Sequence, residues 1–208
     1  MVMDKNQIIS SVKDEDLIKK RRNQMIQGAI RLFKEKGFHR TTTREIAKES
    51  GFSIGTLYEY IRKKEDVLFL VCDYIYDGVQ ERFESAMKLD APSKENVEAV
   101  IRSYYQLMDD MQEEILVLYQ EIKGLNKETR KYVLKKEKDM VAMLEKLILS
   151  SYANLDEAAA AIVANNIFVQ GHMWAFRRWI LQKSFTIEEY ANIQINLNLN
   201  GLLHMKKN

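Results

Sequence analysis

The chain has 208 residues, of which 46% are hydrophobic and 30% are charged, the balance of a globular protein with a sizeable core and not of a disordered chain. With one proline and eight glycines it has too few turn residues for an all-β fold, so the composition favours long helices joined by few turns. The net charge is +2, but residues 1–66 carry +5 and the remainder −3, which indicates that the first third meets a polyanion.

Two further features concern the cellular compartment. No stretch approaches the roughly 20 apolar residues that span a bilayer, and residues 1–20 lack the apolar centre of a secretory signal. Cys72 is the single cysteine, so no internal disulfide can form. We therefore expect a cytoplasmic protein without a membrane partner.

The sequence of the N-terminal region predicts an arm followed by three helices. Residues 1–16 are polar and without periodicity, and we expect a flexible arm. An apolar stripe of helical period predicts a helix over 17–37, which a Lys-Gly pair would end. Two short helices follow, at about 43–50 and 54–61, with a break at Gly51 between them.

Both short helices begin with capping signals. Thr42 and Glu45 have the spacing of a capping box before the first helix, and Ser53 can cap the second. A long helix over about 63–89 follows, and Ala91-Pro92-Ser93 forms a linker. Five further helices are predicted, at about 94–110, 112–124, 127–151, 156–183 and 186–204.

Two short helices joined by a glycine-containing turn, with a longer helix in front, form the helix-turn-helix arrangement. Ala47 allows the two short helices to approach closely, and Gly51 supplies the turn. The second short helix exposes Gly55, Thr56 and Tyr58. Small residues at its start allow it to enter a major groove about 12 Å wide.

Residues 22–68 resemble the DNA-binding domain of the TetR family of transcriptional regulators. The resemblance rests on four runs at fixed spacing: AIRLFKEKGF from Ala29, TTTREIA from Thr41, GFSIGTLYEYI from Gly51 and KED from Lys64. It implies an all-α fold of about nine helices. An N-terminal three-helix helix-turn-helix DNA-binding domain over 17–66 would be followed by a C-terminal helical ligand-binding and dimerisation domain over 67–208.

The resemblance also implies which residues touch DNA. Thr43 and Arg44 begin the first helix of the motif and are expected to contact the backbone and a base, whereas Thr56 faces the groove. Two tyrosines and a lysine at the start of the next helix match positions that touch phosphate, as a helix N-terminus favours. The predicted DNA-binding residues are Thr43, Arg44, Ser53, Ile54, Gly55, Thr56, Tyr58, Tyr60 and Lys64.

Two positions depart from the family pattern. Ile54 stands where many relatives have a polar or basic residue, so a base contact there would be apolar, for example to a thymine methyl group. Glu59 brings a carboxylate near the phosphates, so it points away or accepts a hydrogen bond from a cytosine amino group. The operator sequence therefore does not follow by analogy.

The last two predicted helices indicate self-association. The helix at 156–183 is apolar nearly all round, and the last helix has the same character, so both must be buried on more than one face. In TetR-like proteins these helices build a four-helix dimer interface, which suits a palindromic operator; the alternative is a monomer with both in its own core. The predicted interface residues are Phe168, Gly171, Ala175, Trp179, Ile193 and Leu197.

The middle helices carry an aromatic and methionine-rich set that suits a long apolar guest, or else ordinary core. The segment from Tyr119, with Trp174 and Trp179 later in the chain, resembles family members that sense fatty acyl-CoA. In those proteins basic residues meet the CoA phosphates; here two arginines would do so, or form surface salt bridges. The predicted effector-binding residues are Tyr104, Tyr105, Met108, Met111, Tyr119, Trp174, Arg177 and Arg178.

Together these features predict a ligand-responsive repressor that binds double-stranded operator DNA as a homodimer. A small apolar effector, in the narrower version a long-chain acyl-CoA, would release it. The alternatives are a multidrug or apolar-compound sensor controlling efflux or stress genes, and a helical protein that has lost operator reading. An enzyme, a cofactor and a metal are not expected, because the three histidines form no ligand-spaced set and no glycine-rich phosphate loop is present.

Overall fold

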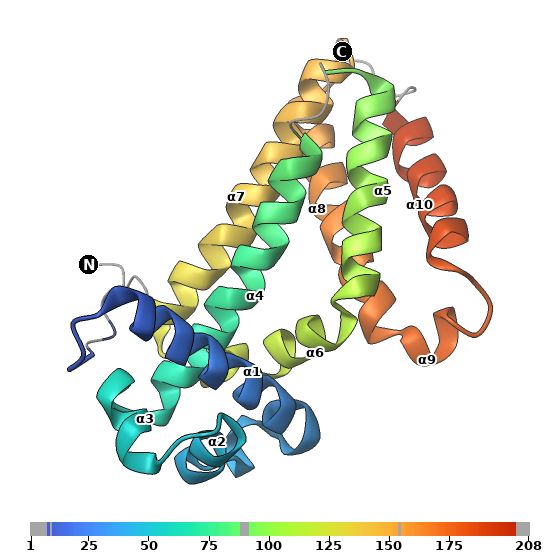
Figure 1. Ribbon diagram of the computed structural model, residues 1–208. Coiled ribbons are helices and arrows are strands. Elements are labelled where there is room, and N and C mark those ends of the chain that lie inside the picture. The colour runs from blue at the N-terminus through green and yellow to red at the C-terminus, as the bar shows by residue number, and fades with distance from the viewer. Residues whose placement is uncertain (1–7, 9, 88–91, 154, 203–208) are drawn as a thin grey trace. The chain divides into compact units, whose positions relative to one another are not determined.

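The computed structural model describes residues 8, 10–87, 92–153 and 155–202, with side chains as far as Asn200. These residues form ten α-helices and one 3-10 turn (Figure 1). In chain order they are α1 (Glu15–Arg40), α2 (Thr43–Glu49), α3 (Ile54–Tyr60), α4 (Lys64–Met87), α5 (Lys94–Asp110), α6 (Gln112–Glu121), η2 (Ile122–Gly124), α7 (Lys127–Ser151), α8 (Glu157–Phe176), α9 (Arg178–Leu181) and α10 (Ile187–Leu202).

The predicted all-α fold is confirmed, and several helix boundaries differ from the prediction. The helix expected to end at Gly37 continues as α1 to Arg40, with Gly37 itself in a non-helical conformation (φ +78°). α1 begins at Glu15 and not at Leu17, because the Asp14 carboxylate accepts a hydrogen bond from Leu17 N (3.0 Å) and caps the helix. The single helix predicted at 156–183 is divided at Arg177, whose φ of −103° and ψ of 19° separate α8 from α9. This break gives ten helices where about nine were expected.

The chain divides into two compact units. Unit 1 contains the residues up to Asp77 together with Leu116–Lys135, and unit 2 contains Gly78–Ile115 and the residues from Lys136 onward. The division falls within α4, α6 and α7, so each of these helices contributes to both units. The functional boundary predicted after residue 66 stays a prediction.

The described part of the N-terminal arm contacts helix α1 of the same unit. Residues 1–7 and 9 lie outside the described residues. Ile8 is buried, and its carbonyl oxygen accepts a hydrogen bond from Nη2 of Arg22 in α1 (2.5 Å). The flexible arm expected over 1–16 stays a prediction, and its last two residues belong to α1.

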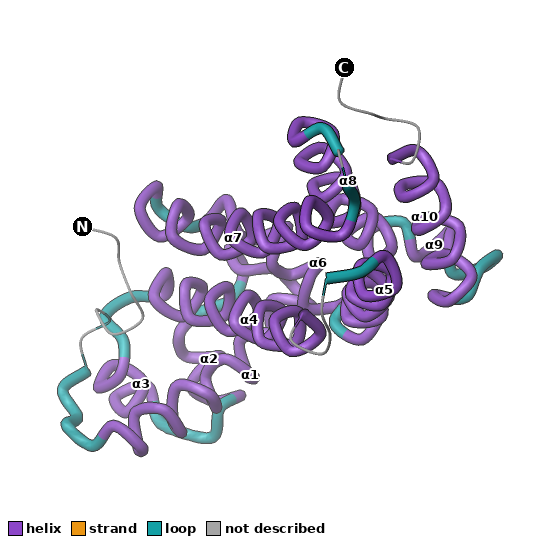
Figure 2. The backbone as a smooth tube through the Cα atoms, turned by 90° about the horizontal axis from the view of Figure 1, so that it is seen from above, coloured by secondary structure: helices purple, strands orange, loops and turns teal. Residues whose placement is uncertain are grey.

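Helix α1 lies across α2 and α3 in unit 1 (Figures 1 and 2). The three helices contribute the fully buried side chains of Phe33, Ile46 and Leu57, and the first half of α4 adds a continuous buried run from Val67 to Cys72. A run buried on all sides of a helix requires neighbours on all sides. The short helices of the motif are therefore held by tertiary packing more than by their own length.

Unit 2 is built on α5, which packs against both α8 and α10. Its core is aromatic: the ring of Phe83 in α4 lies 6.1 Å from that of Tyr104 and 5.4 Å from that of Phe168, centroid to centroid. Edge-to-face contacts of this kind contribute beyond the area they bury. None of the helices within the described ranges combines the length and the apolar character that a bilayer crossing needs.

Candidate DNA-binding interface and effector region

Both helices of the helix-turn-helix begin at complete N-caps, as the sequence predicts. Glu45 N donates to the Thr42 hydroxyl (3.3 Å) and Thr42 N donates to Glu45 Oε2 (2.9 Å), which completes the capping box. A hydrogen bond from Lys36 Nζ (2.5 Å), with those from Thr42, lowers the pKa of Glu45 to about 2. Ser53 Oγ accepts from Thr56 N (3.1 Å) and caps α3.

Two glycines allow the helices of the motif to turn and to meet. Gly51 has a φ of +80°, the left-handed region, and turns the chain between α2 and α3. Gly28 in α1 faces the end of α2, where an added Cβ would lie 2.8 Å from Ser50 Oγ. The turn at Gly51 was predictable from the sequence, whereas a glycine inside a helix does not indicate what it faces.

Eight of the nine predicted DNA-binding residues are exposed or half-buried, and seven of them belong to α2, α3 and the Ser53 cap. The Tyr58 hydroxyl lies 3.2 Å from Thr43 Oγ1, which links the exposed face of α3 to the start of α2. Hydroxyl groups of this kind can hydrogen bond phosphate oxygens or base edges. The individual DNA contacts stay predictions. These seven residues are Thr43, Arg44, Ser53, Ile54, Gly55, Thr56 and Tyr58, and the eighth is Lys64 at the start of α4.

Tyr60 does not lie on this surface. It is 2% exposed and belongs to the core of unit 1. The reason is helical spacing, because Tyr60 follows the buried Leu57 by three residues and therefore shares its inward face. The predicted phosphate contact of Tyr60 is wrong in this structure.

Lys64 is a structural cation. Its Nζ lies 3.0 Å from Phe38 O, 3.3 Å from His39 O and 3.0 Å from Thr41 O, and 4.3 Å from the centre of the Phe38 ring. The end of α1 is also held from α6, because Phe38 N donates to Glu121 Oε1 (2.9 Å, buried). All three protons of the ammonium have carbonyl acceptors, which gives Lys64 a structural role, and the phosphate contact predicted for it stays a prediction.

Other basic side chains are exposed around the motif and were not singled out from the sequence. They are Arg40 at the end of α1, Lys48 in α2, and Arg62 and Lys63 before α4. Exposed cations supply the sequence-independent attraction to phosphate. The net charge of +5 on residues 1–66 indicates that exposed basic side chains are present, but it does not indicate which of them face DNA.

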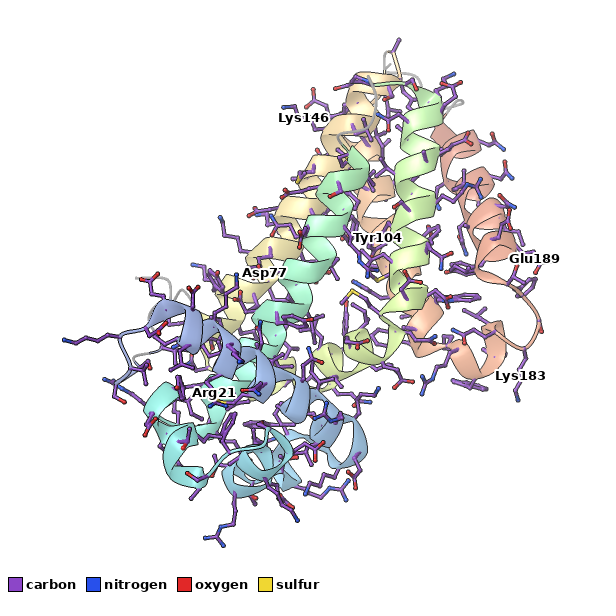
Figure 3. The ribbon with its side chains drawn as sticks, in the orientation of Figure 1. Arg21, Asp77, Tyr104, Lys146, Lys183 and Glu189 are labelled. Carbon is purple, nitrogen blue, oxygen red and sulfur yellow. The ribbon has the colours of Figure 1, made fainter. Side chains whose placement is uncertain are left out.

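Four of the predicted effector-binding residues form packed core in unit 2. Tyr104, Tyr105 and Met108 on α5 and Trp174 on α8 are at most 2% exposed. The Tyr104 side chain lies between helices (Figure 3), with its ring 4.5 Å from that of Phe168 and its hydroxyl donating to Phe168 O (3.1 Å). These four side chains fill the space predicted for a guest, so a guest could bind there only by displacing some of them.

The polar atoms of this core have protein partners. The Tyr105 hydroxyl donates to Gln170 Oε1 (2.9 Å), and burial raises the pKa of Tyr105. Trp174 Nε1 donates to Asp109 Oδ1 (2.7 Å). These bonds tie α5 to α8 and would resist opening of the core.

The remaining predicted effector residues lie nearer the surface. Arg178 forms an ion pair with Glu113, the salt-bridge alternative, and Arg177 is exposed with its guanidinium 5.2 Å from the centre of the Trp179 ring. Met111 is half-buried between α5 and α6. Tyr119 is exposed and belongs to unit 1.

Three of the six predicted dimer-interface residues face the core of their own chain. Phe168, Gly171 and Ala175 are buried, and an added Cβ on Gly171 would lie 2.4 Å from Cε1 of Tyr104 and 3.0 Å from Cγ of Met108. Gly171 thus brings α8 close to α5 of the same chain. The physical reason is that both faces of α8 are apolar, so its sequence does not distinguish inside from outside.

The other three interface residues are exposed apolar side chains, as an interface requires. Leu197 is 68% exposed, and Trp179 and Ile193 are also exposed. α8 adds Ile162 and Val169, seven residues apart and therefore on one side of the helix.

The known proteins that this chain resembles include transcriptional regulators. Residues 25–71 match the family model of bacterial regulatory proteins, tetR family. The chain is 27% identical over 184 residues to the HTH-type transcriptional regulator HbdR of Aromatoleum sp. (strain CIB), which spans 88% of this chain and 80% of that protein. It is 30% identical over 110 residues to the fatty acid metabolism regulator protein of Bacillus subtilis (strain 168), 53% of this chain and 57% of that protein.

A solved structure shows the same fold. AibR in complex with isovaleryl coenzyme A and operator DNA aligns with a TM-score of 0.69 over 85% of this chain and 97% of that one. The sequence identity is 22%, so this similarity establishes the fold alone.

Proposed function

We propose that this chain, whose residues 25–71 match the tetR family of bacterial regulatory proteins, is a repressor that binds a palindromic operator as a homodimer and leaves it when a small apolar effector binds. The observation that carries the proposal is the exposed face of α2 and α3, where the Thr43 and Tyr58 hydroxyls lie 3.2 Å apart and both helices have complete N-caps. Hydroxyls can read base edges and phosphates, and the exposed cations around them supply affinity.

A homodimer accounts for the apolar side chains that α8 and α10 expose. The exposed polar residues that accompany them include Asn165 on α8 and Asn192, Asn196 and Asn200 on α10. This part of the surface carries amide groups and few charges, so two copies can meet without desolvating ions. A two-fold dimer would place two copies of α3 one DNA turn apart, about 10 base pairs.

The effector would act by opening the aromatic core of unit 2. Binding among Tyr104, Tyr105 and Trp174 breaks the bonds to Gln170 and Asp109, so the liganded state must differ from the described one. A ligand shifts an equilibrium only through its differential affinity for two states, and this rearrangement would supply it.

A long-chain acyl-CoA is the effector that we favour. AibR carries isovaleryl coenzyme A, and the Bacillus subtilis relative is named a fatty acid metabolism regulator. The acyl chain suits an apolar core, and the exposed Arg177 could meet a CoA phosphate. Arg178 could do so only after leaving Glu113.

Fluorescence anisotropy on a duplex from upstream of the protein's own gene tests the proposal, with palmitoyl-CoA as the effector, coenzyme A as its control and a scrambled duplex as competitor. We expect salt-dependent specific binding that micromolar palmitoyl-CoA abolishes and coenzyme A does not. Specific binding that ignores palmitoyl-CoA would favour the multidrug or apolar-compound sensor. Equal binding to the scrambled duplex would contradict operator reading.

A further inference from the structure

The C-terminal end of α3 lacks a local cap. Its seven residues, Ile54–Tyr60, make only two turns, a length at which an isolated helix is unstable in water. The last carbonyl groups of a helix have no donor within it. Ile61, the next residue, is extended with a φ of −141°, so the helix is not closed by a left-handed residue.

A segment near the N-terminus supplies hydrogen-bond donors to a carbonyl group at this end of α3. We call Ile8 and residues 10–13 the strap. The Glu59 carbonyl oxygen accepts hydrogen bonds from Ser11 N (2.9 Å), Ser10 Oγ (2.9 Å) and Ser11 Oγ (3.3 Å). The loop that leads into α1 lies beside α3 in both views of the backbone (Figures 1 and 2).

The strap is itself held at both ends. At its start Ile8 is buried and its carbonyl is bonded to Arg22 of α1. In its middle Val12 N donates to Ser10 Oγ (3.1 Å), which orients the hydroxyl that reaches Glu59. Its end leads into Asp14, the N-cap of α1. The strap therefore joins the start of α1 to the end of α3 by tertiary contacts.

We propose that the strap is a positioning element for sequence reading, with Ser10 and Ser11 as its positioning residues. The inference rests on the proposed operator binding. The Glu59 carbonyl follows Tyr58 directly, so the strap holds the last turn of α3 and with it the exposed ring of Tyr58. Base contacts require side chains held within about 0.5 Å, whereas attraction between cations and phosphates tolerates a looser helix. Loss of the strap bonds therefore lowers operator affinity more than non-specific affinity.

The double variant Ser10→Ala/Ser11→Ala tests this inference in the full chain. Its operator affinity should fall about 5- to 20-fold, the cost of two lost hydrogen bonds, while affinity for a scrambled duplex changes less than about twofold. Amide hydrogen exchange should quicken in the last turn of α3 and not in α1. Ser150→Ala is the matched control, since its hydroxyl also donates to a helix carbonyl, that of Lys146 (2.8 Å).

The outcomes separate this inference from the proposed function. Unchanged operator affinity, or an equal loss on both duplexes, would overturn the positioning role. If the wild-type chain binds no operator specifically, the proposed function fails, and the positioning role in sequence recognition fails with it. This holds even if amide hydrogen exchange in α3 depends on Ser10 and Ser11.

Discussion

Replacing Lys64 with methionine distinguishes two roles of this side chain: a structural role in the fold and contact with a DNA phosphate. The substitution keeps the apolar stem but removes the hydrogen bonds to Phe38 O, His39 O and Thr41 O at 3.0–3.3 Å. A hydrogen bond to a charged group is worth about 1.5–3 kcal/mol. Because three bonds share one half-exposed ammonium, we expect the free energy of unfolding to fall by about 2–3 kcal/mol in total. At roughly 2–4 °C per kcal/mol for a chain of this size, Tm should fall by about 4–12 °C.

Two measurements check the result. Thermal unfolding gives Tm, and anisotropy on operator DNA at several salt concentrations gives the salt slope, which each phosphate contact changes by about 0.9. We expect a lower Tm with an unchanged slope for Lys64→Met. The neighbouring Lys63 is exposed, and Lys63→Met should leave Tm unchanged. A Lys64→Met variant with wild-type Tm and a reduced salt slope would refute the structural role and support the predicted phosphate contact.

Four further predictions concern the core and the dimer. Gly171→Ala should destabilise the chain by about 1–3 kcal/mol in chemical denaturation, since the new methyl would lie 2.4 Å from Tyr104, and an unchanged midpoint would contradict this close approach. Burial raises the pKa of the Tyr190 hydroxyl to about 12, against about 10 in the unfolded chain. The stabilising contribution of the neutral hydroxyl is therefore complete below pH 10 and is lost as pH rises toward 12. A denaturation midpoint that does not fall between about pH 9 and 11 would count against this raised pKa. Burial, with a smaller contribution from nearby carboxylates, raises the pKa of Cys72 to about 12, so a thiol reagent at pH 8 should react only after unfolding, and immediate reaction would show an open core. Leu197→Asp should convert a dimer into a monomer in light scattering, and a dimer that persists would place the interface elsewhere.

Features set by neighbouring residues were predictable from the sequence. The capping box of Thr42 and Glu45, the Ser53 cap and the turn at Gly51 all depend on contacts within four residues. The apolar periodicity likewise predicted most helices, because a helix face is defined by spacing alone. These local signals fixed the arrangement of α2 and α3 and most of their exposed face.

Features set by distant residues were not predictable in this way. The carbonyl partners of Lys64 lie 23–26 residues earlier in the chain, and Ser10 meets Glu59 across 49 residues. The two apolar faces of α8 look alike in sequence, which is why Phe168 was assigned to the outside although it faces Tyr104. A resemblance transfers positions along the chain, but the surroundings of a side chain come from the fold.

Selection of binding sites from a random duplex library is the most direct test of whether α2 and α3 recognise a palindromic operator. We expect an enriched two-fold palindrome whose half-sites are centred about 10 base pairs apart or a multiple of it. Thr56→Ala should enrich a different half-site, because this side chain lies on the exposed part of α3. A library that yields no enriched palindrome with the wild-type chain would contradict operator recognition by α2 and α3.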